Sequence, residues 1–438
     1  MTFNRRELLQ ATLAAGSSLV LPSTALAQSM AGLTPGKPYA GQEVKVMAVR
    51  SSQFASHAKR SKAFEEATGI KVTYVDVPFG SMREKLTAEM VATSADFDLA
   101  TIMDVWIPPM VEPYLMPLNA YLRTQKFNLD RYPPAFLSAS QFKGETYGLP
   151  NRCHIQLLFY RKDVFAEVGI TPPKTWAELV TAGKAIQAKR PDMAGVAIPY
   201  GKNAGQNLMI WYNFLWGNGS DLFDAQLKPI FNNAKGLQAT QDYVDIILKH
   251  KITPPGGASF VEQDAAGSFV QGKSAMLPIW WHIYNRFGGK DSVITKEQVG
   301  FVPLPTYAGA EPSTYVNDWI YGVNKRSKVP KATLEFLTWI SQPEIERAIL
   351  VDPTENDVVA VNWSNLRDPE VNKRFGDMHN VAARALTKTK TIPNIPEFLP
   401  AVDVMEVAMS NIVTGQATVA DAMNGAASQV ARIMRRAS

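Results

Sequence analysis

The sequence predicts an α/β protein with a mainly parallel sheet flanked by helices, and three observations lead to that class. The 438 residues are 46% hydrophobic and 19% charged, a globular composition that excludes a disordered, collagen-like or coiled-coil chain. Short apolar or alternating runs, typical of strands, are separated by longer stretches with helical spacing. From residue 44 they follow in the order strand, helix, strand, helix, strand, which builds a parallel sheet.

The first part of this sheet is predicted between residues 44 and 103. A helix over 54–68 ends at Gly69, a residue that readily takes the left-handed conformation of a helix end. A second helix, over 82–93, follows Ser81, whose hydroxyl is the expected N-cap. The strands that these helices connect are predicted at 44–49, 71–77 and 97–103.

Strand and helix signals continue to residue 435. Thr175 is the expected N-cap of a helix over 177–189, and the nearly all-apolar stretch 207–216 predicts a helix buried on most sides. Further strands are predicted at 147–160, with an interruption at Pro150, and at 194–199, 274–281, 299–304 and 315–323. Further helices are predicted at 164–169, 232–249, 259–271, 332–341, 343–351 and 418–435.

Residues 1–27 have the three parts of an export peptide: the positive pair at 5–6, an apolar run over 8–21, and small residues at 25–27 for cleavage. The apolar run is too short to span ~30 Å of hydrocarbon at ~1.5 Å per residue. The paired arginines resemble the twin-arginine signal. A loose lead-in over 28–42 follows, and we expect the mature chain to be soluble in the periplasm.

Charge and cysteine content exclude several other classes. The net charge of +5 is too small for this length to indicate nucleic-acid binding, and Cys153 alone cannot form a disulfide framework or a thiolate zinc cluster. The five histidines show no i,i+4 pair, and neither a GxSxG turn nor a dinucleotide-binding glycine motif is present. We therefore expect no catalytic residues, no metal and no cofactor.

Residues 267–274 match the phosphate-binding pattern GxxxxGK(S/T). That chemistry requires a strand before the loop and a helix N-terminus after it. Here the preceding residues have helical spacing and the following ones, which include Pro278, are typical of a strand. We therefore interpret the match as a helix that ends at Gly272.

Several of the nine tryptophans stand at the ends of predicted elements, close to Asn or Asp. An indole can stack on the C–H face of a sugar ring while carboxylates and amides orient its hydroxyls, so the pattern favours a polyhydroxylated neutral ligand. The alternative is that these tryptophans belong to the core. The residues are Asp104 and Trp106, Asn207 and Trp211, Trp280 and Trp281, and Asp318 and Trp319. Because adjacent strand residues face opposite ways, at most one of Trp280 and Trp281 is expected to face a cleft.

Five stretches carry a family resemblance by their order and spacing, at 64–72, 160–179, 215–224, 269–276 and 393–396. Together they resemble the extracellular solute-binding proteins of sugar-importing ABC transporters, the maltose-binding-protein-like group, over almost all of residues 43–435. The resemblance implies a two-lobed periplasmic-binding-protein fold that closes around its ligand by hinge bending. It implies a first lobe of 43–149 plus about 316–352 and a second lobe of 150–315 plus about 353–438.

The resemblance also implies a set of ligand-binding positions. One departure concerns the segment after 393–396, where an aromatic residue stacks on the sugar in the maltose-binding branch but Val402 stands here. A monosaccharide, polyol or small glycoside is therefore as well supported as a maltodextrin. The implied positions are Asp104, Trp106, Asn151, Arg152, His154, Asn207, Trp211, Trp280, Trp281, Asp318, Trp319 and Asn356.

Three functions follow from the sequence. The first is a monomeric periplasmic protein that captures a sugar, polyol or small glycoside and delivers it to the permease subunits of an ABC importer. The second is a binder of a phosphorylated or anionic glycerol or sugar derivative, or of a polyamine; an anionic ligand requires Arg or Lys in the cleft, and Arg152 is the candidate there. The third is an exported carbohydrate-active enzyme, which requires a titratable pair that the sequence does not indicate.

Overall fold

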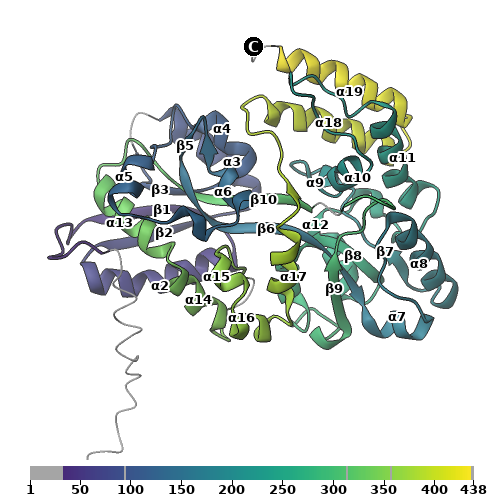
Figure 1. Cartoon of the computed structure of the whole chain (residues 1–438), viewed down its shortest axis with the longest axis horizontal. Coiled ribbons are helices and arrows are strands. Elements are labelled where there is room, and N and C mark those ends of the chain that lie inside the picture. Colours follow the sequence, from purple (N-terminus) through teal and green to yellow (C-terminus); the bar gives the residue numbers. More distant parts are fainter. Residues whose placement is uncertain (1–32, 93–94, 312–313, 356–357, 436–438) are drawn as a thin grey trace, which may run out of the picture.

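Two α/β lobes share one continuous mixed sheet in the computed structural model, which describes residues 33–92, 95–311, 314–355 and 358–435 (Figure 1). The strand order is β2-β1-β3-β10-β6-β8-β7, with β9 beside β6 and β11 beside β10. The strands are β1 Glu43–Val49, β2 Lys71–Val77, β3 Leu99–Met103, β6 Gly148–Arg161, β7 Ala194–Val196, β8 Ser274–Trp280, β9 Val299–Pro303, β10 Thr314–Val323 and β11 Thr389–Lys390. A separate two-stranded sheet consists of β4 Gln141–Phe142 and β5 Glu145–Thr146.

Strands β6 and β10 cross between the lobes. The first part of β6 pairs with β10, whereas its second part pairs with β8 and β9. Strand β1 is parallel to β2 and β3, as the sequence predicts, but β10 runs antiparallel to both β3 and β6. One strand carries the chain out of the first lobe and the other brings it back, so the pair is antiparallel and the sheet is mixed.

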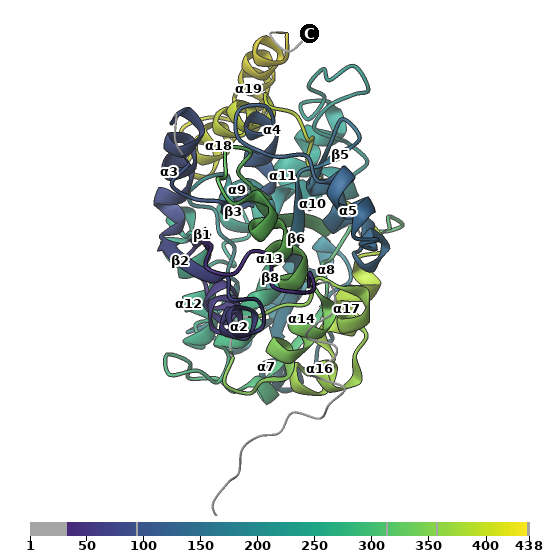
Figure 2. The same ribbon diagram turned by 90° about the vertical axis from the view of Figure 1, so that its left-hand side faces the viewer.

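Helices cover both faces of the sheet in each lobe (Figures 1 and 2). Buried side chains therefore lie on both faces, and β10 is buried along its whole length. The first lobe contains α2 Ser52–Thr68, α3 Phe79–Val91, α4 Ile107–Met110, α5 Asn119–Thr124, α6 Pro134–Ala139, α13 Pro330–Ile340 and α14 Pro343–Val351. The second contains α7 Lys162–Val168, α8 Trp176–Lys189, α9 Gln206–Met209, α10 Trp211–Gly217, α11 Ala234–Leu248, α12 Glu262–Val270, α18 Phe398–Val413 and α19 Val419–Met434.

Three short helices lie where the two lobes meet. They are α15 Trp363–Leu366, α16 Pro369–Arg374 and α17 Met378–Ala385. Helices α15 and α16 pack on α14, and α17 packs on β9, so this segment contacts both lobes. The sequence assigns it to the second lobe, and that division of the chain stays a prediction.

Local capping explains where several helices begin and end. Helix α8 has the predicted cap: the Thr175 hydroxyl accepts from the Glu178 amide at 3.1 Å, and the Glu178 carboxylate accepts from the Thr175 amide at 3.3 Å. Helix α2 ends at Gly69, which adopts a left-handed φ of 74°.

Two sequence predictions differ from the structure in detail, and one long helix was not predicted. Ser81 is not an N-cap, because α3 starts two residues earlier, directly after Pro78. The single helix predicted over 207–216 is two short helices, α9 and α10, that meet at Ile210. The sequence also did not predict α18, the amphipathic partner of α19.

The phosphate-loop match at 267–274 lies at a helix end, as interpreted. Helix α12 ends at Val270, Gly272 adopts a left-handed φ of 69°, and β8 begins at Ser274. A strand therefore follows the loop where a phosphate site requires a helix N-terminus. Within the described ranges, none of the helices has the length and apolar character needed to cross a membrane.

Candidate ligand-binding site

A cleft between the lobes consists of two connected compartments. One has a volume of about 270 Å³ and the other about 320 Å³. They share five lining residues, Phe79, Met103, Asn203, Met209 and Asn317, so they form one continuous space. These shared residues come from the first lobe, the second lobe and the crossing strand β10, so a ligand here touches both lobes.

The crossing strands point alternate side chains into this cleft. Arg152 and His154 of β6 line it, as do Tyr315, Asn317 and Trp319 of β10. The strand register places Trp319 opposite Arg152 and Asn317 opposite His154. Because side chains alternate along a strand, the intervening residues face the other side of the sheet.

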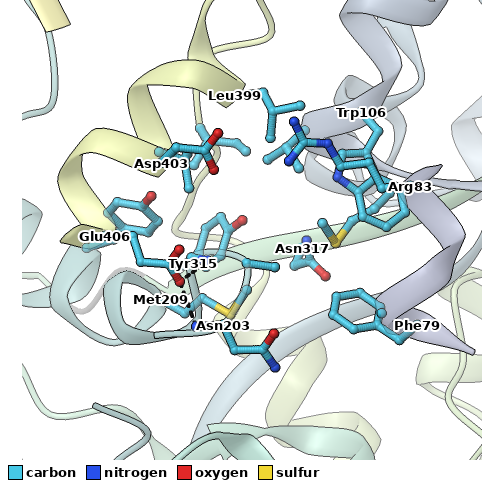
Figure 3. A pocket seen from close by; sticks show the side chains of 18 residues that line it. Phe79, Arg83, Trp106, Asn203, Met209, Tyr315, Asn317, Leu399, Asp403 and Glu406 are labelled. Atoms are coloured by element: carbon cyan, nitrogen blue, oxygen red, sulfur yellow. Dashed lines mark hydrogen bonds between the residues drawn. The ribbon is translucent and has the colours of Figure 1, made fainter. Parts of the chain in front are cut away.

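The first compartment has mainly apolar walls, and we call it the aromatic compartment. Trp106 stacks near Phe79, with ring centroids 6.1 Å apart, and meets Trp319 edge-on at 5.5 Å. Figure 3 shows Arg83 on the Trp106 side and the carboxylates of Asp403 and Glu406 on the opposite side. Its other lining residues are Gly80, Met103, Val105, Asn203, Ala204, Gly205, Met209, Tyr212, Tyr315, Asn317, Ile392, Leu399 and Val402.

Glu406, on α18, fixes the loop that precedes α9. Its carboxylate accepts from the backbone amides of Asn203 at 2.7 Å and Gly205 at 2.6 Å. Burial raises the pKa of this carboxyl group, and these two hydrogen bonds act against the rise. Glu406 therefore positions Asn203, a residue that both compartments share.

The second compartment is lined by two histidines, His154 and His282, and by two arginines, and we call it the basic compartment. His282 Nε2 lies 3.3 Å from Glu262 Oε1, and the ring centroids of His154 and His282 are 4.6 Å apart. Trp280 and Trp319 supply aromatic walls. Its other lining residues are Val49, Arg50, Ser51, Phe79, Met103, Arg152, Asn203, Gln206, Met209, Val261, Gln263 and Asn317.

Burial and neighbouring charges set the ionisation of these groups. Burial, together with the positive charge of Arg152 and the neighbouring His282, holds the pKa of His154 well below its usual value, so this imidazole is neutral. Burial alone would raise the pKa of Glu262, but His282 and then Arg152 and Arg286 lower it. Neither ring nitrogen of His154 has a hydrogen-bond partner among the described residues. The ring therefore offers one donor and one acceptor to a ligand.

Of the residues that the sequence predicts as ligand-binding, the structure brings five to the cleft: Trp106, Arg152, His154, Trp280 and Trp319. It places three others in the core. Asn207 donates to the Glu406 carbonyl at 3.0 Å, Trp211 donates to the Thr240 hydroxyl at 2.9 Å, and Trp281 donates to the Cys153 carbonyl at 3.1 Å. All three are fully buried and line neither compartment.

The remaining predicted residues also lie away from the cleft. Asn151 faces the other side of the sheet and donates to the Leu149 carbonyl at 3.3 Å. Asp104 and Asp318 line neither compartment but a further cavity of about 160 Å³, which shares Ile392 with the aromatic compartment. Asn356 lies outside the described residues.

The sequence analysis did not predict several of the lining residues, although the positions of two of them after predicted strands could have indicated a binding site. Phe79 and Arg50 each lie just beyond the carboxyl end of a parallel strand, where ligands of open α/β sheets bind. Glu262, His282, Asn203 and Glu406 come from the second lobe, and only the fold brings them to the crossing strands.

The cavity behind the crossing strands contains a buried carboxylate pair. Asp104 accepts from the amide of Val105 at 2.7 Å and from Asn317 Nδ2 at 2.9 Å. Burial raises its pKa to about 7, and these hydrogen bonds act against the rise. Asp318 is fully buried, no N–H or O–H group of the described residues donates to it, and the weakly donating Cys153 thiol lies beside it. Burial and then Asp104 raise the pKa of Asp318 well above its usual value.

We expect Asp318→Asn to stabilise the protein at neutral pH. The pKa of Asp318 is raised in the folded protein, so its carboxyl group stays protonated there, whereas in the unfolded chain it loses its proton above about pH 4. Rising pH therefore favours the unfolded chain, and the contribution of Asp318 to the free energy of unfolding falls. The gain over wild type should be about 1–3 kcal/mol at pH 7 and vanish near pH 4. Thermal unfolding at several pH values measures it. Asp403→Asn, at an exposed carboxylate, should change little; a variant less stable than wild type at pH 7 would contradict the explanation.

Comparisons with known proteins agree with this architecture. Residues 49–346 match the family described as bacterial extracellular solute-binding protein. A probable amino-acid ABC transporter periplasmic-binding protein of Sinorhizobium fredii is 27% identical over 87% of this chain and 86% of its own. The mannitol-binding protein of Pseudomonas aeruginosa is 24% identical over 68% of each chain. A solute-binding protein of Agrobacterium radiobacter K84, solved with ribitol, shares the fold with a TM-score of 0.80 and 22% identity, covering 90% of this chain and all of its own.

Proposed function

The chain belongs to the bacterial extracellular solute-binding protein family, and from that premise we propose that it captures a sugar or polyol between its lobes for an ABC importer. The observation that carries the proposal is the composition of the cleft. Indole faces from both lobes, Trp106, Trp280 and Trp319, surround one space with the polar side chains of His154 and Asn317. Aromatic faces and convergent hydrogen-bonding groups suit polyhydroxylated ligands.

The printed names of similar proteins support the same ligand class. They include proteins named for mannitol and arabinooligosaccharide, and structures with ribitol and D-mannitol. The Sinorhizobium protein is named for amino acids, so amino acids must be included when ligands are tested. Export by residues 1–27, a periplasmic location and a monomeric state complete the proposal.

A thermal-shift screen tests the proposal. The panel contains sugars, polyols, sugar acids, sugar phosphates and amino acids, each added to the purified protein. A ligand at ~100 times its dissociation constant adds roughly 2.7 kcal/mol to the free energy of unfolding, which is readily seen as a rise in Tm. A rise with amino acids alone, and with no polyhydroxylated compound, would refute the proposal.

Trp280 and its neighbour Trp281 provide a matched pair of variants. Trp280 lines the basic compartment, so Trp280→Ala should weaken binding of the best ligand by on the order of 1–3 kcal/mol through lost stacking and contact area. Trp281 is buried against Cys153 and His379, so Trp281→Ala should lower stability and leave the affinity of the folded protein unchanged. Titration calorimetry together with unfolding curves measures both. The opposite pattern would place Trp281, not Trp280, at the ligand.

A further inference from the structure

Arg152 is a half-buried cation without a partner. Its side chain lines the basic compartment, and it makes no hydrogen bond or ion pair with the described residues. Burying a guanidinium group costs free energy unless an anion or hydrogen-bond acceptors replace the lost water. Its planar fork of N–H groups matches a carboxylate in two parallel hydrogen bonds. An anionic ligand requires an Arg or Lys in the cleft. Arg152 lies there, and its guanidinium group is available to bind such a ligand.

The charges around Arg152 leave the compartment positive. Arg50, just after β1 of the first lobe, also lines it and makes no side-chain hydrogen bond or ion pair with the described residues. Glu262 is the one carboxylate among the described lining residues, and His282 contacts it at 3.3 Å. Arg50 and Arg152 supply two guanidinium groups against the one carboxylate of Glu262, an excess of one positive charge among these three side chains. That excess matches one carboxylate on a ligand.

The other lining groups suit hydroxyls. The neutral His154, 2% exposed, has two unpartnered ring nitrogens, one donor and one acceptor. Asn203, Gln206 and Asn317 surround the same space, and Trp280 offers an aromatic face. An anion without hydroxyls would leave the two ring nitrogens of His154 without partners, which costs free energy. The compartment therefore fits a short polyhydroxylated chain or ring that carries the charge.

We propose that the ligand is a sugar acid, an aldonate or uronate, whose carboxylate is bound by Arg152 with support from Arg50. The proposal rests on the proposed function and narrows its ligand class. A carboxylate is favoured over a phosphate because a phosphate carries about −1.5 to −2 charges, more than the compartment's excess, and would lie beside Glu262.

The test compares matched ligands by titration calorimetry on the purified protein. The first set is D-glucitol, D-gluconate and D-glucitol 6-phosphate; the second is D-glucose and D-glucuronate. In at least one set the carboxylate should bind at least about tenfold more tightly than its neutral partner, as expected for charge-assisted hydrogen bonds. Arg152→Gln should reduce that ratio to about one, and Arg152→Lys should retain part of it.

Arg123→Gln is the matched control. Arg123 is exposed on α5 and lines neither compartment, so this variant changes the net charge equally and should keep the preference. If neutral sugars or polyols bind and the acids bind no tighter in both sets, the inference fails while the proposed function stands. Tighter binding of the phosphate would overturn the carboxylate assignment. If no compound with hydroxyls binds, the proposed function fails and the inference with it.

Discussion

Trp211→Ala is expected to lower the free energy of unfolding by about 3–5 kcal/mol and to leave the ligand affinity of the folded protein unchanged. Trp211 is fully buried in α10. Its indole N–H donates to Thr240 on α11 at 2.9 Å, and its ring packs edge-on against Phe231 at 6.2 Å. Removing the ring leaves a cavity and removes one hydrogen bond of the Thr240 hydroxyl, which still donates to the Gly236 carbonyl at 2.8 Å. Denaturant unfolding measures the loss as a lower midpoint with an unchanged slope.

Trp363→Ala is the comparison, because Trp363 is only half-buried and packs against Arg367 on the surface. Its cost should be clearly smaller. Titration of the Trp211 variant with the best ligand from the screen completes the experiment. A large loss of affinity with little loss of stability would place Trp211 at the ligand, as the sequence suggested, and would contradict its position in this structure.

Local signals in the sequence were enough to predict most of the sheet. Strands β1 and β2 have the predicted course, and α8 has its Thr175 cap, because short-range pattern and capping chemistry determine them. The α/β class and the two-lobed fold are confirmed. The antiparallel direction of β10 relative to β3 and β6 could not be predicted from its own residues, because it depends on how the chain returns from one lobe to the other.

The site was only partly predictable, for a different reason. Residue type identifies Trp and Asn or Asp as suitable groups, but the side that each one faces depends on strand register and packing. Asn317 and Asp318 are adjacent, and the register puts Asn317 in the cleft and Asp318 behind it. Likewise Trp280 lines the cleft, whereas Trp281 lies in the core. Residues such as His282 reach the cleft only through tertiary structure.

Glu346→Ala is expected to cost about 3–5 kcal/mol of stability, because this carboxylate is a buried hydrogen-bonding centre. From α14 it accepts from the backbone amides of Val361 at 2.5 Å and Asn362 at 3.2 Å. The side-chain amides of Asn362, at 2.9 Å, and Asn365, at 2.5 Å, also donate to it. Burial raises its pKa, and these hydrogen bonds act against the rise. Without the carboxylate, four donors lose their acceptor, and each unpaired buried donor costs about 1–3 kcal/mol unless water reaches it.

The same substitution should also weaken ligand binding, although Glu346 lies outside the cleft. The segment that Glu346 holds continues to Val359, whose amide donates to Gln53 at 3.0 Å; Gln53 in turn donates to the Asn151 carbonyl at 2.9 Å. Asn151 directly precedes Arg152, so loosening this segment removes support from the arginine's backbone. Glu344→Ala, on the same helix but exposed, is the matched control and should leave stability and affinity nearly unchanged. Hydrogen exchange should show faster exchange at 359–362 in the Glu346 variant; unchanged exchange there, with unchanged stability, would show that the carboxylate does not hold the segment.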